Sequence, residues 1–253
     1  DATPSSPVER TFSVTVAEVS DNATIAFNTD AIVADDIIED RPVPLFNQTL
    51  TALEDLLAAD DTTDSVISNY LSGLQPLIVA TAGDVVGVPE KITQINISIV
   101  DGSDNPLTTA LIVHYSALYD DVSDTGNVSD KITALPGGSF SITAEGEVDG
   151  NGNLTGTYFL PKGLVIVPPA DHNGELKLNV TAIAQDETAS TLQSSASSLS
   201  FDLKSVSEAP ELAVQDASGL EINDVEDTAI NLSITPTKAA ENGELTIVIS
   251  GVP

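Results

Sequence analysis

The sequence predicts an all-β protein, an Ig-like or cadherin-like antiparallel β-sandwich in tandem repeat, with a short helical insertion near residues 50–77. Three observations predict it: short runs alternate apolar and polar residues, Val, Ile, Thr and Phe dominate these runs, and turn-forming residues separate them. The chain has 253 residues, enough for one large domain or two ordinary ones. Hydrophobic residues make up 41%, which is enough to build a core.

The alternation first occurs in residues 11–19 (TFSVTVAEV), where Phe12, Val14 and Val16 are separated by polar residues. A period of two is typical of a half-buried strand. The same pattern returns at 92–100, 139–148, 174–184 and 197–206. Many short strands of this kind favour a sandwich or a barrel.

Two short segments predict tight turns between strands. Residues 149–153 (DGNGN) separate two strand-like runs, and Asn-Gly is a strong hairpin signal. Residues 171–174 (DHNG) precede another run. Residues 120–130 (DDVSDTGNVSD) are predicted to form an acidic loop.

Between residues 50 and 77 the apolar spacing changes to that of a helix. One group of apolar residues is Leu53, Leu56 and Leu57. A second group, which Thr63 or Asp64 could cap, consists of Val66, Ile67, Tyr70, Leu71 and Leu74. We expect one or two short helices here, inserted across one end of the sandwich, and no helix elsewhere.

The chain contains an internal repeat. When it is shifted by 187 positions, Phe12, Val14 and Val16 fall on Leu199, Phe201 and Leu203 without a gap. The shift also places 39–40 (Glu-Asp) on 226–227 (Glu-Asp). The alternation stays in phase, so the same face is expected to be buried in both copies.

This repeat predicts three parts. Residues 1–20 would be the last strand of a preceding repeat, 21–207 a complete expanded repeat, and 208–253 the opening strands of the next one. A chain that contains one complete repeat between two partial ones is expected of a segment from a long array of tandem repeats. The absence of Met fits a chain that starts after processing or within a longer one.

The repeat resembles the tandem Ig-like or cadherin-like repeats of giant bacterial surface adhesins, the type I-secreted kind related to RTX proteins. The matching segments are 226–228 (EDT), 249–253 (ISGVP), 164–169 (LVIVPP), 173–174 (NG), 179–182 (NVTA) and 208–210 (EAP). Segments 46–89 and 101–138 have no counterpart in the short family repeat. The resemblance implies an extracellular extender module on the cell surface, stiffened by calcium at the repeat junctions.

Acidic residues gather near both expected junctions, and Ca²⁺ takes six to eight oxygen ligands. Without a bound cation, the carboxylates within such a cluster would repel each other and push the junction apart. The 187-residue shift aligns three pairs of acidic residues, and these are the candidate calcium ligands. Asp21 aligns with Glu208, which is also acidic but of a different type. Two pairs are identical, Glu39 with Glu226 and Asp40 with Asp227. The alternative is a solvated acidic surface.

Two further motifs have a structural and a functional interpretation. Residues 149–153 place oxygen-bearing side chains as in the first half of an EF-hand loop, but Leu160 stands where the bidentate Glu belongs, which favours a plain hairpin. Asn-X-Ser/Thr occurs at Asn22, Asn47, Asn96, Asn127, Asn153, Asn179 and Asn231. These could be glycan acceptors, or polar residues on outward-facing strand positions.

Composition and motifs argue against several functions. The formal net charge of -31 excludes a nucleic-acid binder, which needs a basic patch, and disfavours docking on anionic lipid. The chain has no Cys, hence no disulfide or thiolate site. Histidines occur only at 114 and 172, no nucleophile elbow or Walker loop is present, and Trp is absent, so we expect no enzymatic activity.

The sequence therefore predicts a non-enzymatic extender segment of a giant extracellular adhesin or fibre, whose partners are neighbouring repeats. Two alternatives stay open. One is a subunit of a surface filament or surface layer, assembled by donor-strand exchange through residues 11–19. The other is a module that binds carbohydrate or protein through 46–89 and 101–138.

Overall fold

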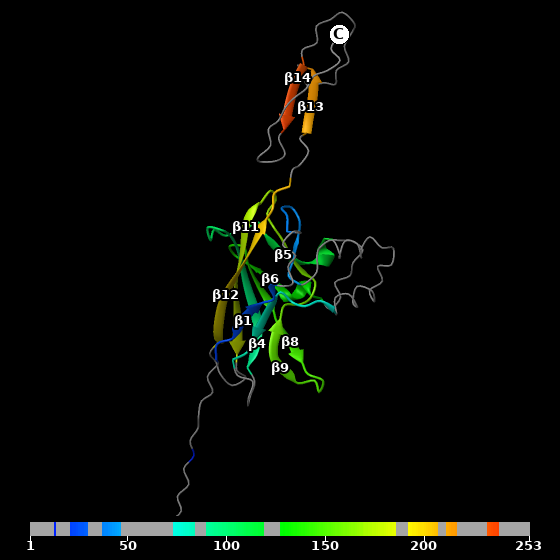
Figure 1. The fold of residues 1–253 in the computed structure, drawn as a ribbon. Helices are drawn as coiled ribbons and strands as arrows, with labels where there is room; N and C mark the ends of the chain where they lie inside the picture. Colours follow the sequence, from blue (N-terminus) through cyan, green and yellow to red (C-terminus); the bar gives the residue numbers. More distant parts are fainter. Residues whose placement is uncertain are drawn as a thin grey trace, which may run out of the picture. The chain divides into compact units, whose positions relative to one another are not determined.

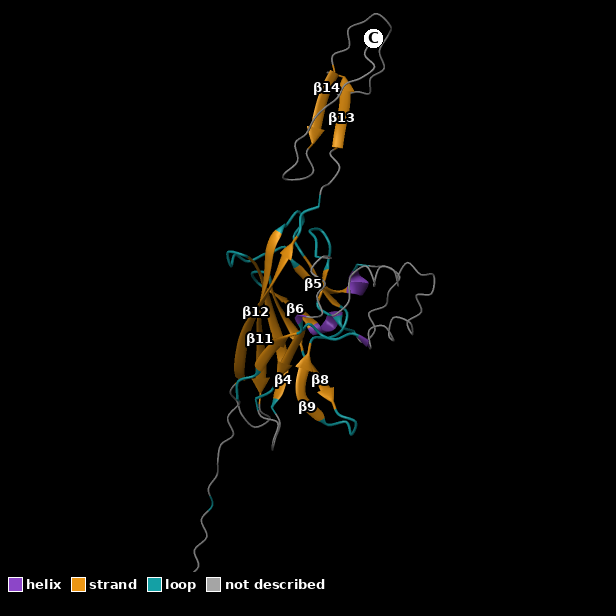
Figure 2. Ribbon diagram, viewed as in Figure 1, coloured by secondary structure: helices purple, strands orange, loops and turns teal. Residues whose placement is uncertain are grey.

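The structure is a computed structural model that describes residues 13, 21–29, 37–46, 73–83, 90–118, 127–185, 192–206, 211–216 and 232–237. The chain divides into two compact units, Asp1–Leu203 and Lys204–Pro253. Within the described residues nearly all regular structure is β-strand, and all strand pairs are antiparallel (Figures 1 and 2). The all-β prediction is confirmed.

The described residues of the first unit form three sheets. A five-stranded sheet has the order β12 (Leu192–Leu203), β11 (Gly174–Gln185), β4 (Lys91–Asp101), β7 (Ser139–Thr143) and β6 (Ile132–Leu135). A four-stranded sheet has the order β1 (Thr24–Phe27), β3 (Ile78–Thr81), β9 (Leu154–Phe159) and β8 (Glu145–Val148). A three-stranded sheet has the order β2 (Val43–Pro44), β10 (Leu164–Val167) and β5 (Leu111–His114).

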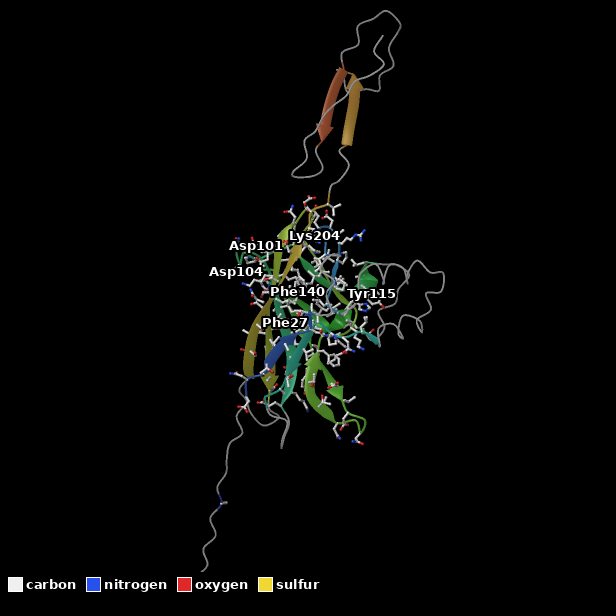
Figure 3. The ribbon with its side chains drawn as sticks, in the orientation of Figure 1. Phe27, Asp101, Asp104, Tyr115, Phe140 and Lys204 are labelled. Atoms are coloured by element: carbon white, nitrogen blue, oxygen red, sulfur yellow. The ribbon has the colours of Figure 1, made fainter. Side chains whose placement is uncertain are left out.

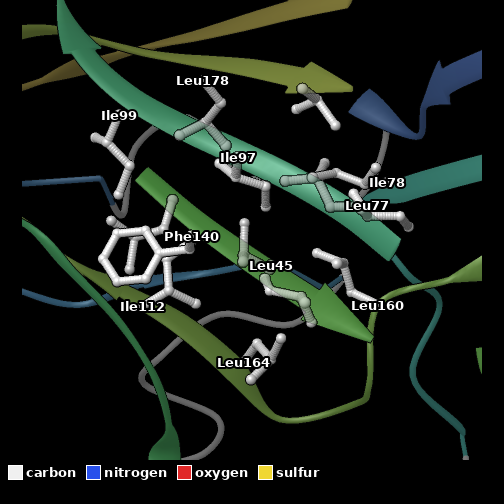
Figure 4. Packing of buried hydrophobic residues seen from close by; sticks show 14 of the residues in the cluster. Leu45, Leu77, Ile78, Ile97, Ile99, Ile112, Phe140, Leu160, Leu164 and Leu178 are labelled. Carbon is white, nitrogen blue, oxygen red and sulfur yellow. The ribbon is translucent and has the colours of Figure 1, made fainter. Parts of the chain in front are cut away.

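The core is built from the inward residues of these sheets. On β4 and β11, alternate residues such as Ile97 and Leu178 are fully buried, as the period-two pattern requires. Leu45, Ile112 and Leu164 belong to the same cluster but come from the three-stranded sheet and its flank (Figure 4). The sheets therefore share one apolar interior, as in a β-sandwich.

Three strand predictions agree with the structure. The segment 92–100 lies in β4 and 174–184 lies in β11. The segment 197–206 agrees only as far as residue 203, because β12 begins earlier, at Leu192, and ends at Leu203. The predicted turn at 149–153 is present before β9. A turn is also present before β11, but it spans 169–172 rather than 171–174, because the His172 N–H donates to the Pro169 carbonyl and Gly174 already begins β11. The segment 11–19 lies outside the described residues, apart from Ser13.

The prediction of one continuous strand over 139–148 was wrong. The chain breaks at Ala144, so that β7 pairs with β4 in the five-stranded sheet and β8 pairs with β9 in the four-stranded one. The backbone N–H of Ala144 donates to the carbonyl of Thr93 at 3.2 Å. Strands that switch sheets form the corners of sandwiches, and such a bend leaves the alternation almost intact, so the sequence did not reveal it.

The helix prediction needs two corrections where the structure describes it. Gly73 is helical, but Pro76 bridges to Phe46 and β3 begins at Ile78, so the helical insertion does not reach residue 77. Short 3₁₀ helices also occur outside it, η3 (Tyr115–Ala117) and η4 (Ser129–Lys131). Such single turns lack the apolar period that marks a helix in a sequence. Residues 50–72 lie outside the described part of the chain.

The second unit contributes one described hairpin-like pair. β13 (Glu211–Asp216) and β14 (Leu232–Thr237) are antiparallel, with Glu211 opposite Thr237 and Asp216 opposite Leu232.

Candidate functional site

The structure describes three of the candidate calcium ligands, Asp21, Glu39 and Asp40. Glu208, Glu226 and Asp227 lie outside the described residues. The three that are described occupy two separate places in the first unit, one at Asp21 and one at Glu39 and Asp40.

Asp21 lies next to a buried carboxylate that the sequence analysis missed. The backbone N–H of Asp21 donates to Oε1 of Glu90, whose side chain is only 2% exposed. The Tyr158 hydroxyl donates to the Glu90 carbonyl oxygen at 3.4 Å. Glu90 therefore fastens the chain ahead of β1 to the start of β4. No sequence signal could have found it, because the burial of an isolated Glu depends on the tertiary fold.

Glu39 and Asp40 lie beside the turn that precedes β11. Oδ1 of Asp40 accepts the backbone N–H of Asp171 at 2.9 Å, and Oε2 of Glu39 accepts the side-chain amide of Asn173 at 3.4 Å. Asp40 has a left-handed backbone, with φ of 59°. Both carboxylates therefore bind groups of the fold, and they fix this loop to the beginning of β11.

These two places are at opposite ends of the long strands. Glu90 directly precedes β4, whereas the turn at 171–173 precedes β11, whose residue Leu176 pairs with Asp101 at the far end of β4. An 11-residue strand spans about 35 Å. Asp21 therefore cannot share an ion with Glu39 and Asp40 of the same unit.

The described residues do not by themselves fit a calcium site. Within them, no group of three or more His, Asp or Glu side chains lies close enough to hold a metal ion. Ca²⁺ needs more oxygen ligands than either place offers. Any such site would need ligands from outside the described part of the chain.

Two turns of the first unit share one hydrogen-bonded design. In 101–105 (DGSDN) Oδ1 of Asp101 accepts the N–H groups of Ser103 and Asn105, both at 2.8 Å. In 149–153 (DGNGN) Oδ1 of Asp149 accepts the N–H groups two and four residues later, at 2.8 and 2.9 Å. These are Asx turns, in which the carboxylate satisfies loop donors. The Asp149 carboxylate is thus used inside its own hairpin, which supports the plain-hairpin interpretation.

These hydrogen bonds lower the pKa of both carboxyl groups. The main cause is Asn105 for Asp101, through its side-chain amide and then its backbone N–H, and the backbone N–H of Asn153 for Asp149. Donors that favour the ionised form make protonation of the folded protein harder than that of the unfolded chain. The stabilisation is therefore complete above the unfolded pKa of about 3.9 and is lost as the pH falls through the lower folded values.

We expect that Asp149→Asn makes stability less dependent on pH below about pH 4, since the variant has no such carboxyl group to protonate. Melting temperatures measured between pH 5 and pH 2 check this. The control is Asp130→Asn, at an exposed aspartate for which no side-chain hydrogen bond is recorded. Equal pH dependence in Asp149→Asn and in the unaltered chain would contradict the expectation.

The histidines have structural surroundings. His114 is 1% exposed and ends β5; its Nδ1 lies 2.8 Å from the Ser116 hydroxyl and also accepts the Ser116 N–H at 3.4 Å, which caps η3. Its ring packs on Tyr115, with centroids 4.3 Å apart. His172 follows the turn at 169–171. His114 therefore shapes a 3₁₀ turn and contacts a serine that belongs to the same turn.

Two of the Asn-X-Ser/Thr motifs lie on adjacent strands. Asn96 on β4 is opposite Thr181 on β11, and Asn179 on β11 is opposite Ser98 on β4. In each motif the middle residue, Ile97 or Val180, is fully buried. These two motifs therefore follow from strand alternation, with polar residues outward and an apolar residue between them.

Comparisons with protein-family models, with curated proteins and with solved structures found no match. In the part of the chain that the structure describes, no helix is both long and apolar enough to cross a membrane. Function is therefore inferred from the chain's own residues and geometry.

Proposed function

We propose that this chain is a non-enzymatic extender segment of a long extracellular repeat protein, an adhesin or fibre at the cell surface. Its role would be to hold a terminal binding domain away from the cell through Ig-like or cadherin-like sandwiches joined end to end. Its partners would be the neighbouring repeats.

One observation carries the proposal. β1 and β13 begin 187 residues apart, at Thr24 and Glu211, which is the same offset that brings the two ends of the sequence into phase. The unit boundary after Leu203 also lies close to the expected end of the complete repeat at 207. Equivalent strands at equivalent positions in two compact units are expected of tandem repeats.

The two units differ in how these strands pair. β1 pairs with β3, whereas β13 pairs with β14, which begins at the equivalent of Leu45.

Complete sequencing of the parent gene tests the proposal, because an array predicts further copies of the 21–207 pattern. A parent protein in which this pattern occurs once would overturn it.

The acidic sequence motivates the calcium part of the proposal. With a formal net charge of -31, carboxylates brought together at a junction repel each other unless a cation binds them. By the 187-residue offset, Glu208 corresponds to Asp21, whereas Glu226 and Asp227 correspond to Glu39 and Asp40, at the opposite end of the first unit. For the junction after Leu203 we therefore propose Glu226 and Asp227 as one pair of calcium ligands, with Glu208 as a ligand at a separate place.

We expect Ca²⁺ to raise the melting temperature of the chain, because an ion that binds only the folded state stabilises it by about 2.7 kcal/mol at a hundredfold excess over Kd. Melting and small-angle scattering with Ca²⁺, and with chelator at matched ionic strength, check this. Glu226→Gln with Asp227→Asn should remove the effect. The matched control is Glu147→Gln with Asp130→Asn, which removes the same charges at exposed positions outside the candidate ligands. No effect of Ca²⁺ on the unaltered chain would exclude the junction site.

A filament subunit is the second candidate, and one observation favours it. β12 lies at an edge of the five-stranded sheet, and its residues 192–201 (LQSSASSLSF) contain no charge and no proline. Long uncharged edges invite strand addition. Light scattering separates the candidates, because a donor-strand subunit assembles as its concentration rises and an extender segment stays monomeric.

A further inference from the structure

The outward face of the five-stranded sheet is uncharged over most of its area. Ile97 on β4, Leu178 on β11 and Phe140 on β7 point into the core. The residues that alternate with them along each of these strands therefore point outward. We call the following set the neutral face: Ser194, Ala196, Ser198, Asn179, Thr181, Ile183, Gln94, Asn96, Ser98, Ser139, Ser141, Thr143, Thr133 and Leu135.

The register places these side chains in rows across the strands. One row runs Ala196, Thr181, Asn96, Ser141 and Thr133, and the pairs along it are Thr181 with Ala196, Thr181 with Asn96, Asn96 with Ser141, and Ser141 with Thr133. Neighbouring strands lie about 4.8 Å apart, and residues on the same face of one strand about 6.8 Å apart. Apart from Ala196, Ile183 and Leu135, the neutral face is therefore a regular grid of hydroxyl and amide groups.

Part of this grid is already paired within the protein. The hydroxyls of Ser98 and Ser139 lie 2.8 Å apart, and the Ser198 hydroxyl donates to Oδ1 of Asn179 at 2.8 Å. For Thr181 and Ser141, which flank Asn96, the structure records no side-chain hydrogen bond within the described residues. Their hydroxyls are thus available to water or to a ligand.

Charged side chains lie at the two ends of the sheet. At one end Lys91 begins β4, and Lys131, directly before β6, donates to Glu145 at 2.6 Å. The other end carries a second group of charges. Lys177 donates to Asp104 at 2.7 Å, and Glu175 and Asp202 lie opposite each other in the same end rows. Figure 3 shows Asp101 and Asp104 together at that end. In a chain with 39 acidic residues, a sheet face without any in its middle rows is a distinct chemical surface.

We propose that the neutral face binds a neutral polysaccharide. The chemistry of the neutral face disfavours the other classes of partner. It has no cationic side chains for an anionic polymer, no carboxylates for a basic protein, and few apolar side chains for a hydrophobic protein surface. It offers hydroxyl and amide groups, which pair with the hydroxyls of an uncharged sugar chain. Single contacts of this kind are weak, and a repeated array would add them through multivalency.

The inference does not rest on the proposed function, and binding of the intact chain tests it. Depletion of the protein from solution by insoluble cellulose, chitin and cross-linked dextran is measured, with carboxymethyl cellulose as the anionic counterpart of cellulose. We expect binding to at least one neutral polymer that is unchanged between 0.1 and 1 M NaCl, because no ion pair is involved. Carboxymethyl cellulose should not be bound.

Variants locate the surface. Ser141→Glu with Thr181→Glu should abolish binding, and Ser141→Ala with Thr181→Val, which preserves net charge, should weaken it about tenfold. The control, Ser103→Glu with Thr108→Glu, adds the same charge at exposed positions outside the face and should bind like the unaltered chain. Near-UV circular dichroism verifies that each variant is folded. The proposal is wrong if no neutral polymer is bound, if the Glu pair on the face binds as well as the control, or if binding falls with salt.

Discussion

Leu178→Ala should lower the free energy of unfolding of the first unit by about 2–5 kcal/mol. Leu178 is fully buried in β11, opposite Leu199 on β12 and Ile99 on β4. Because this position lies inside a sheet with neighbours on both sides, the chain cannot collapse into the space that the lost side chain leaves.

Urea unfolding followed by tyrosine fluorescence measures this effect. Each of the 4 tyrosines lies before residue 204, so the signal reports on the first unit alone. Thr181→Ala is the control, on the outward face of the same strand, and should cost less than about 1 kcal/mol. Equal losses in the two variants would mean that β11 does not separate a core face from a solvent face.

Gly163→Ala should destabilise the first unit by about 2–5 kcal/mol, as the sum of backbone strain and overpacking. Gly163 has φ of +86°, which an L side chain rarely adopts, and a Cβ atom there would lie 2.5 Å from Nε2 of His114 and 2.7 Å from Cε1 of Tyr115. His114 and Tyr115 are both buried rings, so neither has room to move away.

Gly152→Ala is the matched control for this variant. Its φ of +84° carries the same backbone strain, but nothing lies within 4 Å of the added Cβ. It should therefore cost only about 1–2 kcal/mol. The same urea experiment measures both variants, and the difference between them isolates the contact with His114 and Tyr115. If the two losses are equal, the rings do not confine Gly163.

The sequence by itself determined the all-β class, the long strands β4 and β11, the turn at 149–153 and the presence of a turn just before β11. Each of these depends on local chemistry: side chains alternate with period two in a strand, and Asp, Asn and Gly favour the backbone angles of tight turns. Ile95, Ile97 and Ile99 point to the same face wherever the strand is placed, so their burial follows from the pattern.

The tertiary structure alone decided which distant residues meet. The change of sheet at Ala144, the buried Glu90 that accepts the Asp21 N–H, and the close approach of Gly163 to His114 all join segments far apart in the sequence. The candidate acids show the same limit: Asp21 and the pair Glu39 and Asp40 are near each other in the sequence, yet the strands that run between them place them at opposite ends of the unit. Alternation fixes the face of a strand on which a residue lies, whereas its neighbours across space depend on how the strands are ordered and connected.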